Sequence, residues 1–231
     1  NMRLDRIGLS LIRAYLGGGG FASDLPFGIT AFVKSREKEP VPDLQLLFWM
    51  GATTTAAPWL PPFKKAFSDS FSVRVMPMRP ESRGYISLSS SDPNEAPVIH
   101  QAFLETDEEL RVMRSGLRLV RELVAQDPLL PFAGEEISPG SQNTSDEAID
   151  AHIRKTMITV HHPVGTCKMG LEPNIDPDSV VNDKLKVHGL NRLRIADASI
   201  MPTIPHGNTN APVTMIAEKA SEFILHDYKN S

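Results

Sequence analysis

Two stretches in the last third of the chain concentrate residues that can do chemistry. They are His161-His162-Pro163-Val164-Gly165-Thr166-Cys167-Lys168-Met169-Gly170, and Leu193 to Pro202 continuing to Gly207-Asn208-Thr209-Asn210-Ala211-Pro212. Neutral imidazole accepts a proton near neutral pH, so a histidine in a turn rich in proline and glycine can serve as a general base. Such a base suits the oxidation of an alcohol, because the hydride leaves more readily once the hydroxyl has lost its proton. An isolated histidine is more often a polar loop residue, and the residues alone leave that alternative open.

Both stretches resemble the glucose-methanol-choline (GMC) oxidoreductase family, in particular its bacterial choline-dehydrogenase-like members. Three shorter strings stand in the family's order and at its spacing: Ser82-Arg83-Gly84, Ser91-Asp92-Pro93 and Pro97-Val98-Ile99. The resemblance covers most of Met76 to Ile224 and extends, less distinctively, to Arg3 to Ser35. It implies an FAD-dependent enzyme in which hydride passes from an alcohol carbon to the flavin N5.

The resemblance also assigns catalytic roles. His162, just before Pro163, matches the family's catalytic histidine, which takes the hydroxyl proton. Asn208 stands where the family has a histidine or an asparagine, and its amide would orient the alcohol and stabilise the developing alkoxide. His206 lies just outside the matching string and is the weaker candidate. A plain turn residue before a helix is the alternative role for Asn208.

The same match implies four residues near the cofactor. Thr209 and Asn210 would contact the flavin at the start of the last helix, where unpaired N–H groups and the helix dipole favour negative charge. Asp197 and Ala198 resemble the family's pair near the ribityl chain and pyrophosphate, although a simple strand-to-turn cap would also explain them. The chain has no Gly-x-Gly-x-x-Gly after a strand. We therefore expect an amino-terminal FAD-binding half, absent from this sequence, as the partner that completes the site.

The expected fold is α+β, with helices packed on an antiparallel sheet. Residues 1–155 would form a substrate-binding domain, and residues 156–231 would carry the catalytic segment and return to a Rossmann-like FAD domain. Local patterns predict a helix that stops at Gly17 to Gly20, a capping box at Thr106 and Glu109, and a helix capped by Ser145. A loop is expected from the glycines to about Phe27. Extended and helical patterns predict strands at 29–33, 44–49, 72–76 paired with 85–88, near Val180 and at 193–196, then a helix from Pro212 to about Leu225.

Composition narrows the function class. The 231 residues are 41% hydrophobic and 23% charged, with a net charge of -4 and Lys and Arg scattered along the chain. This pattern favours a globular protein that binds a small-molecule alcohol, and it favours neither a nucleic-acid partner nor an anionic membrane surface. The single cysteine, Cys167, excludes an intramolecular disulfide. No apolar run reaches the ~20 residues of a membrane span, and the compartment is otherwise open, with the cytoplasm as the default expectation.

Other site chemistries have weaker support in the sequence. His161, His162 and Cys167 could be imagined as metal ligands, but adjacent histidines diverge and no second cysteine or HExxH pattern completes a set, so no metal is expected. A hydrolase nucleophile elbow, Gly-x-Ser-x-Gly, is missing. The non-catalytic alternative stays open: by itself the chain could be an inactive substrate-binding or structural module.

Overall fold

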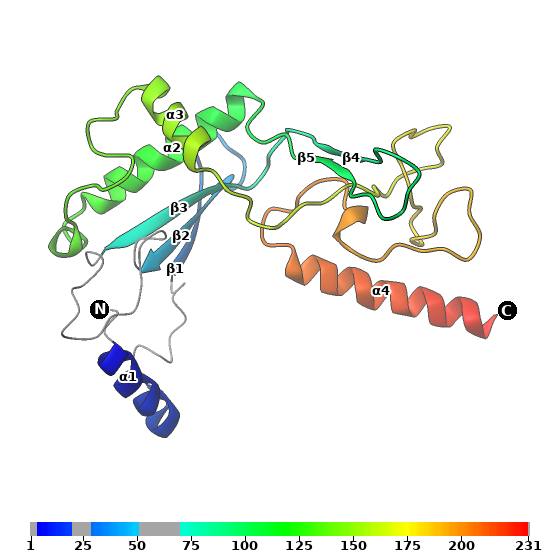
Figure 1. Ribbon diagram of the computed structural model, residues 1–231, viewed down its shortest axis with the longest axis horizontal. Helices are drawn as coiled ribbons and strands as arrows, with labels where there is room; N and C mark the ends of the chain where they lie inside the picture. Colours follow the sequence, from blue (N-terminus) through cyan, green and yellow to red (C-terminus); the bar gives the residue numbers. More distant parts are fainter. Residues whose placement is uncertain (1–3, 20–28, 51–69, 231) are drawn as a thin grey trace. The chain divides into compact units, whose positions relative to one another are not determined.

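Helices and antiparallel strands make up the computed structural model, which describes residues 4–19, 29–50 and 70–230 (Figure 1). The expected α+β class is confirmed. Contacts group the chain into two compact units, one formed within 1–77 and 111–150 and the other within 78–110 and 151–231. The predicted boundary between residues 155 and 156 is a functional one and stays a prediction.

A three-stranded antiparallel sheet forms the centre of the first unit. Its strands are β1 (Ile29–Val33), β2 (Leu44–Met50) and β3 (Phe71–Pro77), in the order β1-β2-β3. Leu46 of the central strand stands opposite Ala31 on one side and Val75 on the other, and it is fully buried. The three predicted strands are therefore confirmed, and the apolar side chains of β2 supply the core of this unit.

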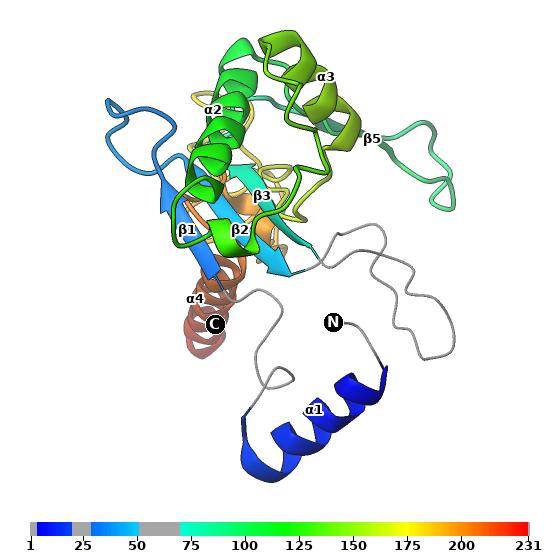
Figure 2. The ribbon, with the colours of Figure 1, turned by 90° about the vertical axis from the view of Figure 1, so that its left-hand side faces the viewer.

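Helix α2 (Asp107–Val124) packs on this sheet, as the sequence predicts (Figure 2). The capping box is present, because Glu109 N–H donates to Thr106 Oγ1 at 3.2 Å and Thr106 N–H donates to Glu109 Oε2 at 3.4 Å. Gly116 faces the sheet so closely that a Cβ there would lie 2.4 Å from Val75 Cγ1. A glycine at this position is what lets the helix approach.

The other helices of the chain follow local signals. Helix α1 (Leu4–Gly17) ends at the glycines, where Gly18 has φ +66°. A one-turn 3-10 helix, η1, spans Leu130–Phe132, and α3 (Asp146–Thr156) begins after Ser145, whose hydroxyl accepts from Ala148 N–H at 3.2 Å. The loop expected up to Phe27 lies outside the described residues. Within the described parts of the chain, no helix is long and apolar enough to cross a membrane.

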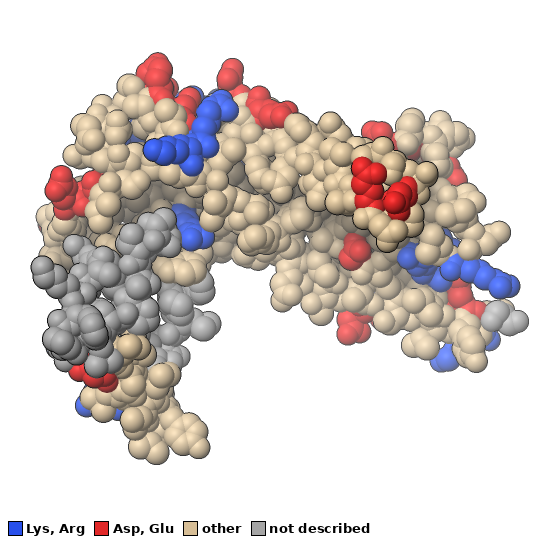
Figure 3. Space-filling model, in the orientation of Figure 1, with Lys and Arg blue, Asp and Glu red and all other residues tan. Residues whose placement is uncertain are grey.

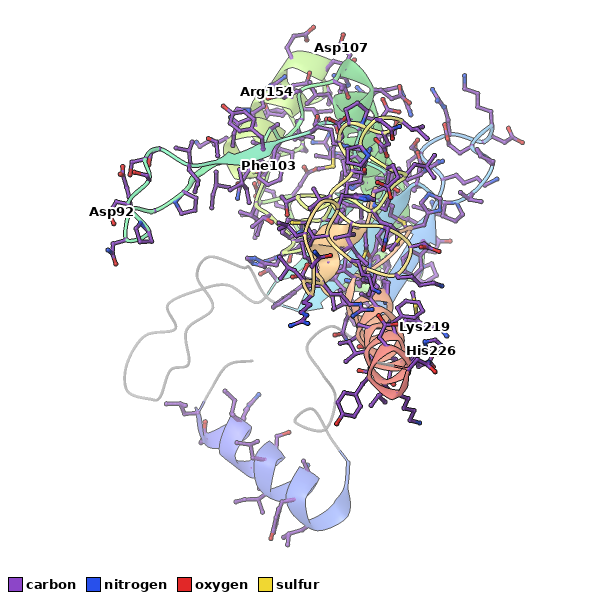
Figure 4. All side chains as sticks on the ribbon, turned by 90° about the vertical axis from the view of Figure 1, so that its right-hand side faces the viewer. Asp92, Phe103, Asp107, Arg154, Lys219 and His226 are labelled. Atoms are coloured by element: carbon purple, nitrogen blue, oxygen red, sulfur yellow. The ribbon has the colours of Figure 1, made fainter. Side chains whose placement is uncertain are left out.

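The predicted pairing of strand β4 is wrong. The segment at 85–88 was expected to pair with 72–76, but β4 (Tyr85–Ser87) pairs with β5 (Val98–His100) in a separate hairpin. Figure 4 shows this hairpin reaching away from the rest of its unit, with Asp92 at its tip. The turn between the strands is closed locally, since the Asp92 carboxylate accepts from Asn94 N–H at 2.9 Å. The two strands and their turn therefore form one local hairpin.

A compact hydrophobic core holds the second unit together, and two strands predicted in this part of the chain are not formed. Its buried members come from the segment after Lys168, from a one-turn 3-10 helix, η2 (Ala198–Ile200), and from helix α4 (Asn210–Lys229). They are Val181, Leu185, Ile200, Met201, Ile216 and Ala220. The strands expected near Val180 and at 193–196 are only isolated bridges, Met169 with Val181, Val181 with Val187, and Lys186 with Arg194. Turns interrupt the chain between these bridges, so no continuous β-ladder forms.

Helix α4 is longer than predicted and is fixed at its far end by charge. Asp227 accepts hydrogen bonds from Lys186 Nζ at 2.6 Å and from Arg194 Nη2 at 2.7 Å, and these bonds hold the pKa of its carboxyl well below the usual range. Elsewhere on the described surface drawn in Figure 3, acidic and basic side chains are spread in small groups. The ion pairs at Asp227 and the core contacts of Ile216 together fix the position of α4, and with it the loop that precedes the helix.

Glu109 gives the first testable prediction, a loss of stability in acid. Burial raises the pKa of this carboxyl, but hydrogen bonds from the Ser82 hydroxyl, Ser82 N–H and Thr106 N–H outweigh burial and leave the pKa lowered. The ionised form therefore stabilises the fold above the ordinary pKa of 4.5, and this contribution is lost as the pH falls through 4.5 to the lower folded value. Glu109→Gln should lower the free energy of unfolding at pH 7 by about 1–2 kcal/mol.

Urea unfolding at pH 7 and at pH 3.5 measures this effect. The difference between the two pH values should be smaller in Glu109→Gln than in the unmodified chain. Glu108→Gln is the matched control, because Glu108 lies in the same helical turn and is exposed. An unchanged pH dependence in Glu109→Gln would contradict the assignment.

Candidate active site

The segment that carries His162 is held against η2 by backbone hydrogen bonds. Cys167 N–H donates to Ser199 O at 3.0 Å, and Met169 N–H donates to Ile200 O at 2.8 Å. Gly165 sits at φ +88°, where a Cβ would also come within 3.3 Å of Met201 O, so this turn requires glycine. These contacts tie the turn to the core of the unit and give the half-buried His162 a fixed place.

His161 lies in an unusual backbone conformation beside the candidate base. Its φ is +61°, in the left-handed region that non-glycine residues rarely adopt, and its N–H donates to Thr159 Oγ1 at 3.0 Å. The following peptide leads into Pro163, which restricts His162 to an extended backbone. Of the two histidines, only His162 has a ring that makes the contacts described next.

The ring of His162 lies between two side chains from the loop before α4. Asn208 Nδ2 is 3.0 Å from His162 Nε2, and Thr209 Oγ1 is 2.8 Å from His162 Nδ1. Asn208 and His162 are 46 residues apart in the sequence. The structure therefore brings the two predicted catalytic residues into direct contact, and Thr209 adds a third member.

The chemistry of these contacts selects one form of the neutral ring. An amide nitrogen can only donate a hydrogen bond, so the contact of Asn208 Nδ2 requires Nε2 to be without a proton. The ring proton then sits on Nδ1 and is donated to Thr209 Oγ1. In this form the Nε2 lone pair accepts from the Asn208 amide. An alcohol hydroxyl that takes the place of this contact can give its proton to Nε2 and accept from the amide N–H. Proton removal from a hydroxyl and stabilisation of the resulting oxyanion are the reactions that such a pair supports.

The other predicted site residues occupy neighbouring positions. Asn210 is the first residue of α4 and is exposed. Asp197 is the N-cap of η2, and its carboxylate accepts from Ser199 N–H at 2.8 Å. Ala198 packs against the core of the unit. The local capping role considered for Asp197 is thus present. His206 is exposed and makes no hydrogen bond to the described part of the chain.

The start of α4 is suited to an electron-rich group. Its N-cap, Thr209, makes no side-chain hydrogen bond to the helix, and the first turn contains no acidic residue. The first N–H groups of a helix have no intrahelical partner, and the dipole makes this end positive. The residues present therefore fit the flavin that the sequence implies here. The described ranges contain no cluster of three or more His, Cys, Asp or Glu side chains that could hold a metal ion.

Sequence reasoning missed the role of the Thr209 side chain. Its predicted contact with the flavin stays a prediction, and in addition its hydroxyl contacts the histidine ring, with the residue only 8% exposed. The two residues are 47 positions apart in the sequence, and this spacing gives no indication that the Thr209 hydroxyl contacts the ring of His162. The signal that could have found it is its place directly after the catalytic candidate Asn208.

Comparison with known proteins shows which family the chain resembles over most of its length. The family model described as GMC oxidoreductase matches residues 80–217, more than half of the chain. Mouse mitochondrial choline dehydrogenase is 40% identical over 94% of this chain and 35% of its own length. The oxygen-dependent choline dehydrogenase of Photobacterium profundum is 39% identical over 97% of this chain and 39% of its own length. The chain thus spans little more than a third of these curated relatives and matches their carboxy-terminal part.

Solved structures give the same fold. Pyridoxine 4-oxidase from Mesorbium loti superposes with a TM-score of 0.71 and 27% identity, over 85% of this chain and 37% of its own. Formate oxidase from Aspergillus oryzae, studied for the modification of its FAD, superposes with a TM-score of 0.70 and 27% identity, over 99% of this chain and 37% of its own. These relatives are oxidases and dehydrogenases.

Proposed function

Because this chain belongs to the GMC oxidoreductase family, we propose that it forms the carboxy-terminal part of an FAD-dependent oxidoreductase that oxidises an alcohol at its CH–OH group. One observation carries the proposal: the ring of His162 is held between Asn208 Nδ2, 3.0 Å from Nε2, and Thr209 Oγ1, 2.8 Å from Nδ1. That arrangement provides a base and an oxyanion donor at one point. An alcohol substrate fits the chemistry that this pair can perform, and a primary alcohol is the class that we propose.

His162 Nε2 accepts the hydroxyl proton of the alcohol in this proposal. The Asn208 amide N–H, 3.0 Å from Nε2, then donates to the oxygen that becomes negative. Loss of the proton raises electron density on the carbon that must release hydride. Bound FAD supplies the hydride acceptor. The protein's own contribution is to orient the alcohol and to hold the proton on the imidazole.

The cofactor would be held by residues on both sides of the base. Thr209 and Asn210 place backbone N–H groups at the positive end of α4, which favours negative charge on a reduced flavin. Asp197 and Ala198, at the start of η2, are proposed to lie near the ribityl chain and pyrophosphate. The partner that supplies the dinucleotide-binding fingerprint is an amino-terminal FAD-binding half. In this arrangement residues 1–155 contribute to the substrate domain, and residues 156–231 to the FAD domain.

A substrate panel on the complete enzyme, meaning this chain joined to its FAD-binding half, tests the proposed function. Anaerobic mixing with choline or with simple primary alcohols should bleach the flavin absorbance for at least one of them, because reduction of the flavin accompanies oxidation of the alcohol. Choline comes first in the panel, since the curated relatives named above act on it by name. A flavin that no alcohol reduces would overturn the proposal and favour the inactive module.

The isolated chain should be colourless, which separates an enzyme half from an independent flavoprotein. It lacks the Gly-x-Gly-x-x-Gly turn that binds a pyrophosphate, so purification should leave no absorbance near 450 nm characteristic of flavin. Adding the FAD-binding half with FAD should restore the absorbance. A yellow isolated chain would contradict the expected division of labour.

Association of the isolated chain is the companion expectation. Helix α4 exposes four large apolar side chains, Met215, Ile224, Leu225 and Tyr228, each more than half exposed. Exposed apolar side chains of this size favour self-association in a chain without its partner. Size-exclusion chromatography should show oligomers, and Ile224→Glu should shift them toward monomer. A monodisperse monomer of the unmodified chain would count against this expectation.

A further inference from the structure

Thr209 occupies a position from which its side chain could stabilise α4, yet the side chain is used elsewhere. Threonine at the N-cap ordinarily accepts a hydrogen bond from an N–H of the first turn, a contact that contributes about 1 kcal/mol. In this protein Thr209 makes no such bond, and its hydroxyl lies 2.8 Å from His162 Nδ1. The backbone of Thr209 still takes part in the helix, because its carbonyl accepts from Val213 N–H at 3.0 Å. The Thr209 hydroxyl therefore contacts the imidazole of His162 and does not cap helix α4.

We propose that Thr209 is a positioning residue for the reaction: its hydroxyl accepts the Nδ1 proton of His162 and so keeps Nε2, the nitrogen that acts as the base, without a proton. The effect on the reaction rate rests on the proposed function, whereas the position of the ring proton rests only on the contact between Thr209 and His162. Thr209 is 8% exposed, so water does not easily replace its hydroxyl at the ring. Asn208 on the opposite side of the ring agrees with the same proton position, because its amide N–H can face only an unprotonated Nε2.

The contact also survives the proton transfer. When Nε2 has taken a proton, both ring nitrogens are donors, and Nδ1 still donates to Thr209 Oγ1. The ring therefore does not need to rotate between its two protonation states. A hydrogen bond from a charged ring is stronger than one from a neutral ring, so the contact favours the protonated product of the transfer. Without it, the ring can rotate and can place its proton on Nε2, and in that form Nε2 cannot accept the proton of the alcohol.

Thr209→Val is the informative variant, because valine has nearly the shape of threonine but no hydroxyl. In the complete enzyme it should lower the rate constant of flavin reduction at saturating alcohol by about tenfold, the lower end for loss of an orienting partner. The apparent binding constant for the alcohol and the bound flavin should change little. Thr209→Ser restores a hydroxyl and should recover most of the rate. Thr214→Val is the matched control, since Thr214 is exposed in the same helix and its hydroxyl donates to the Asn210 carbonyl at 3.0 Å, away from the ring of His162.

A spectroscopic readout separates this inference from the proposed function. In the resting, oxidised complete enzyme labelled with 15N-histidine, the ring signals of His162, assigned by their loss in His162→Gln, report which nitrogen carries the proton. We expect Nδ1–H in the unmodified enzyme and in Thr209→Ser, and a mixture with Nε2–H in Thr209→Val. An Nε2–H ring in the unmodified enzyme, or an unchanged ring in Thr209→Val, would overturn the positioning role. Such a result together with a large rate loss in His162→Gln would leave the proposed function intact, whereas a normal rate in His162→Gln would refute that function itself.

Discussion

His162→Ala should depress flavin reduction in the complete enzyme by about two to four orders of magnitude, the range that general bases usually contribute. Release of hydride is coupled to loss of the hydroxyl proton, so removing the acceptor raises the transition state more than it weakens the ground-state complex. Binding of the alcohol should therefore suffer less than the rate. Stopped-flow measurement of flavin bleaching across a range of alcohol concentrations separates the two quantities.

His206→Ala is the matched control for that experiment. His206 precedes Asn208 by two residues in the same loop but is exposed, whereas the half-buried ring of His162 contacts both Asn208 and Thr209. We expect His206→Ala to reduce flavin at nearly the normal rate. A larger loss in His206→Ala than in His162→Ala, or a normal rate in His162→Ala, would refute the assignment of the base.

Local signals in the sequence predicted several helices and strands because their physical causes are local. A glycine run cannot continue a helix, which explains the end of α1 at Gly17. The capping box of Thr106 and Glu109 needs only residues three apart, and it was found where predicted. The strands β1 to β3 are apolar enough to be recognised separately.

Partner choice is what the sequence could not specify. Tyr85 to Ser87 has an extended pattern, but that pattern does not say whether β3 or β5 pairs with it. Gly84 allows β4 and β5 to pair closely, because a Cβ at this position would lie 1.9 Å from His100 O. In the second unit, short apolar runs such as 193–196 resemble strands, yet they pack in a core without a ladder. Such outcomes depend on tertiary contacts and not on propensity.

The candidate site divides in the same way. His162 and Asn208 were identified from their motifs, and their contact at 3.0 Å agrees with a shared function. The contact of Thr209 with Nδ1 could not be predicted, because it depends on where α4 begins in space relative to the turn at Pro163. A motif reports the chemical types at a site, whereas hydrogen-bond partners of a ring appear only with the fold.

Asn208→Ala should be the second most damaging change, lowering flavin reduction by about 10²-fold, the lower end for loss of one oxyanion donor. Asn208 takes no proton, so its loss should cost less than the loss of His162. Because the amide N–H lies 3.0 Å from Nε2, the oxygen that gives its proton to Nε2 can be reached by this N–H as well. The donor acts mainly on the oxyanion, so the rate should fall more than alcohol binding weakens.

Two further substitutions at Asn208 distinguish a hydrogen-bond donor from a residue that only fills space. Asn208→Asp has nearly the same shape, but a carboxylate only accepts hydrogen bonds and repels a developing alkoxide, so it should be slower than Asn208→Ala. Asn208→His keeps a ring N–H donor, and histidine is the other residue that the family resemblance implies at this position, so it should retain more activity than Asn208→Ala. Stopped-flow bleaching at saturating alcohol orders the three variants. If Asn208→Asp were as fast as the unmodified enzyme, Asn208 could not be the donor to the alkoxide, and its contact with His162 would serve only to hold the ring.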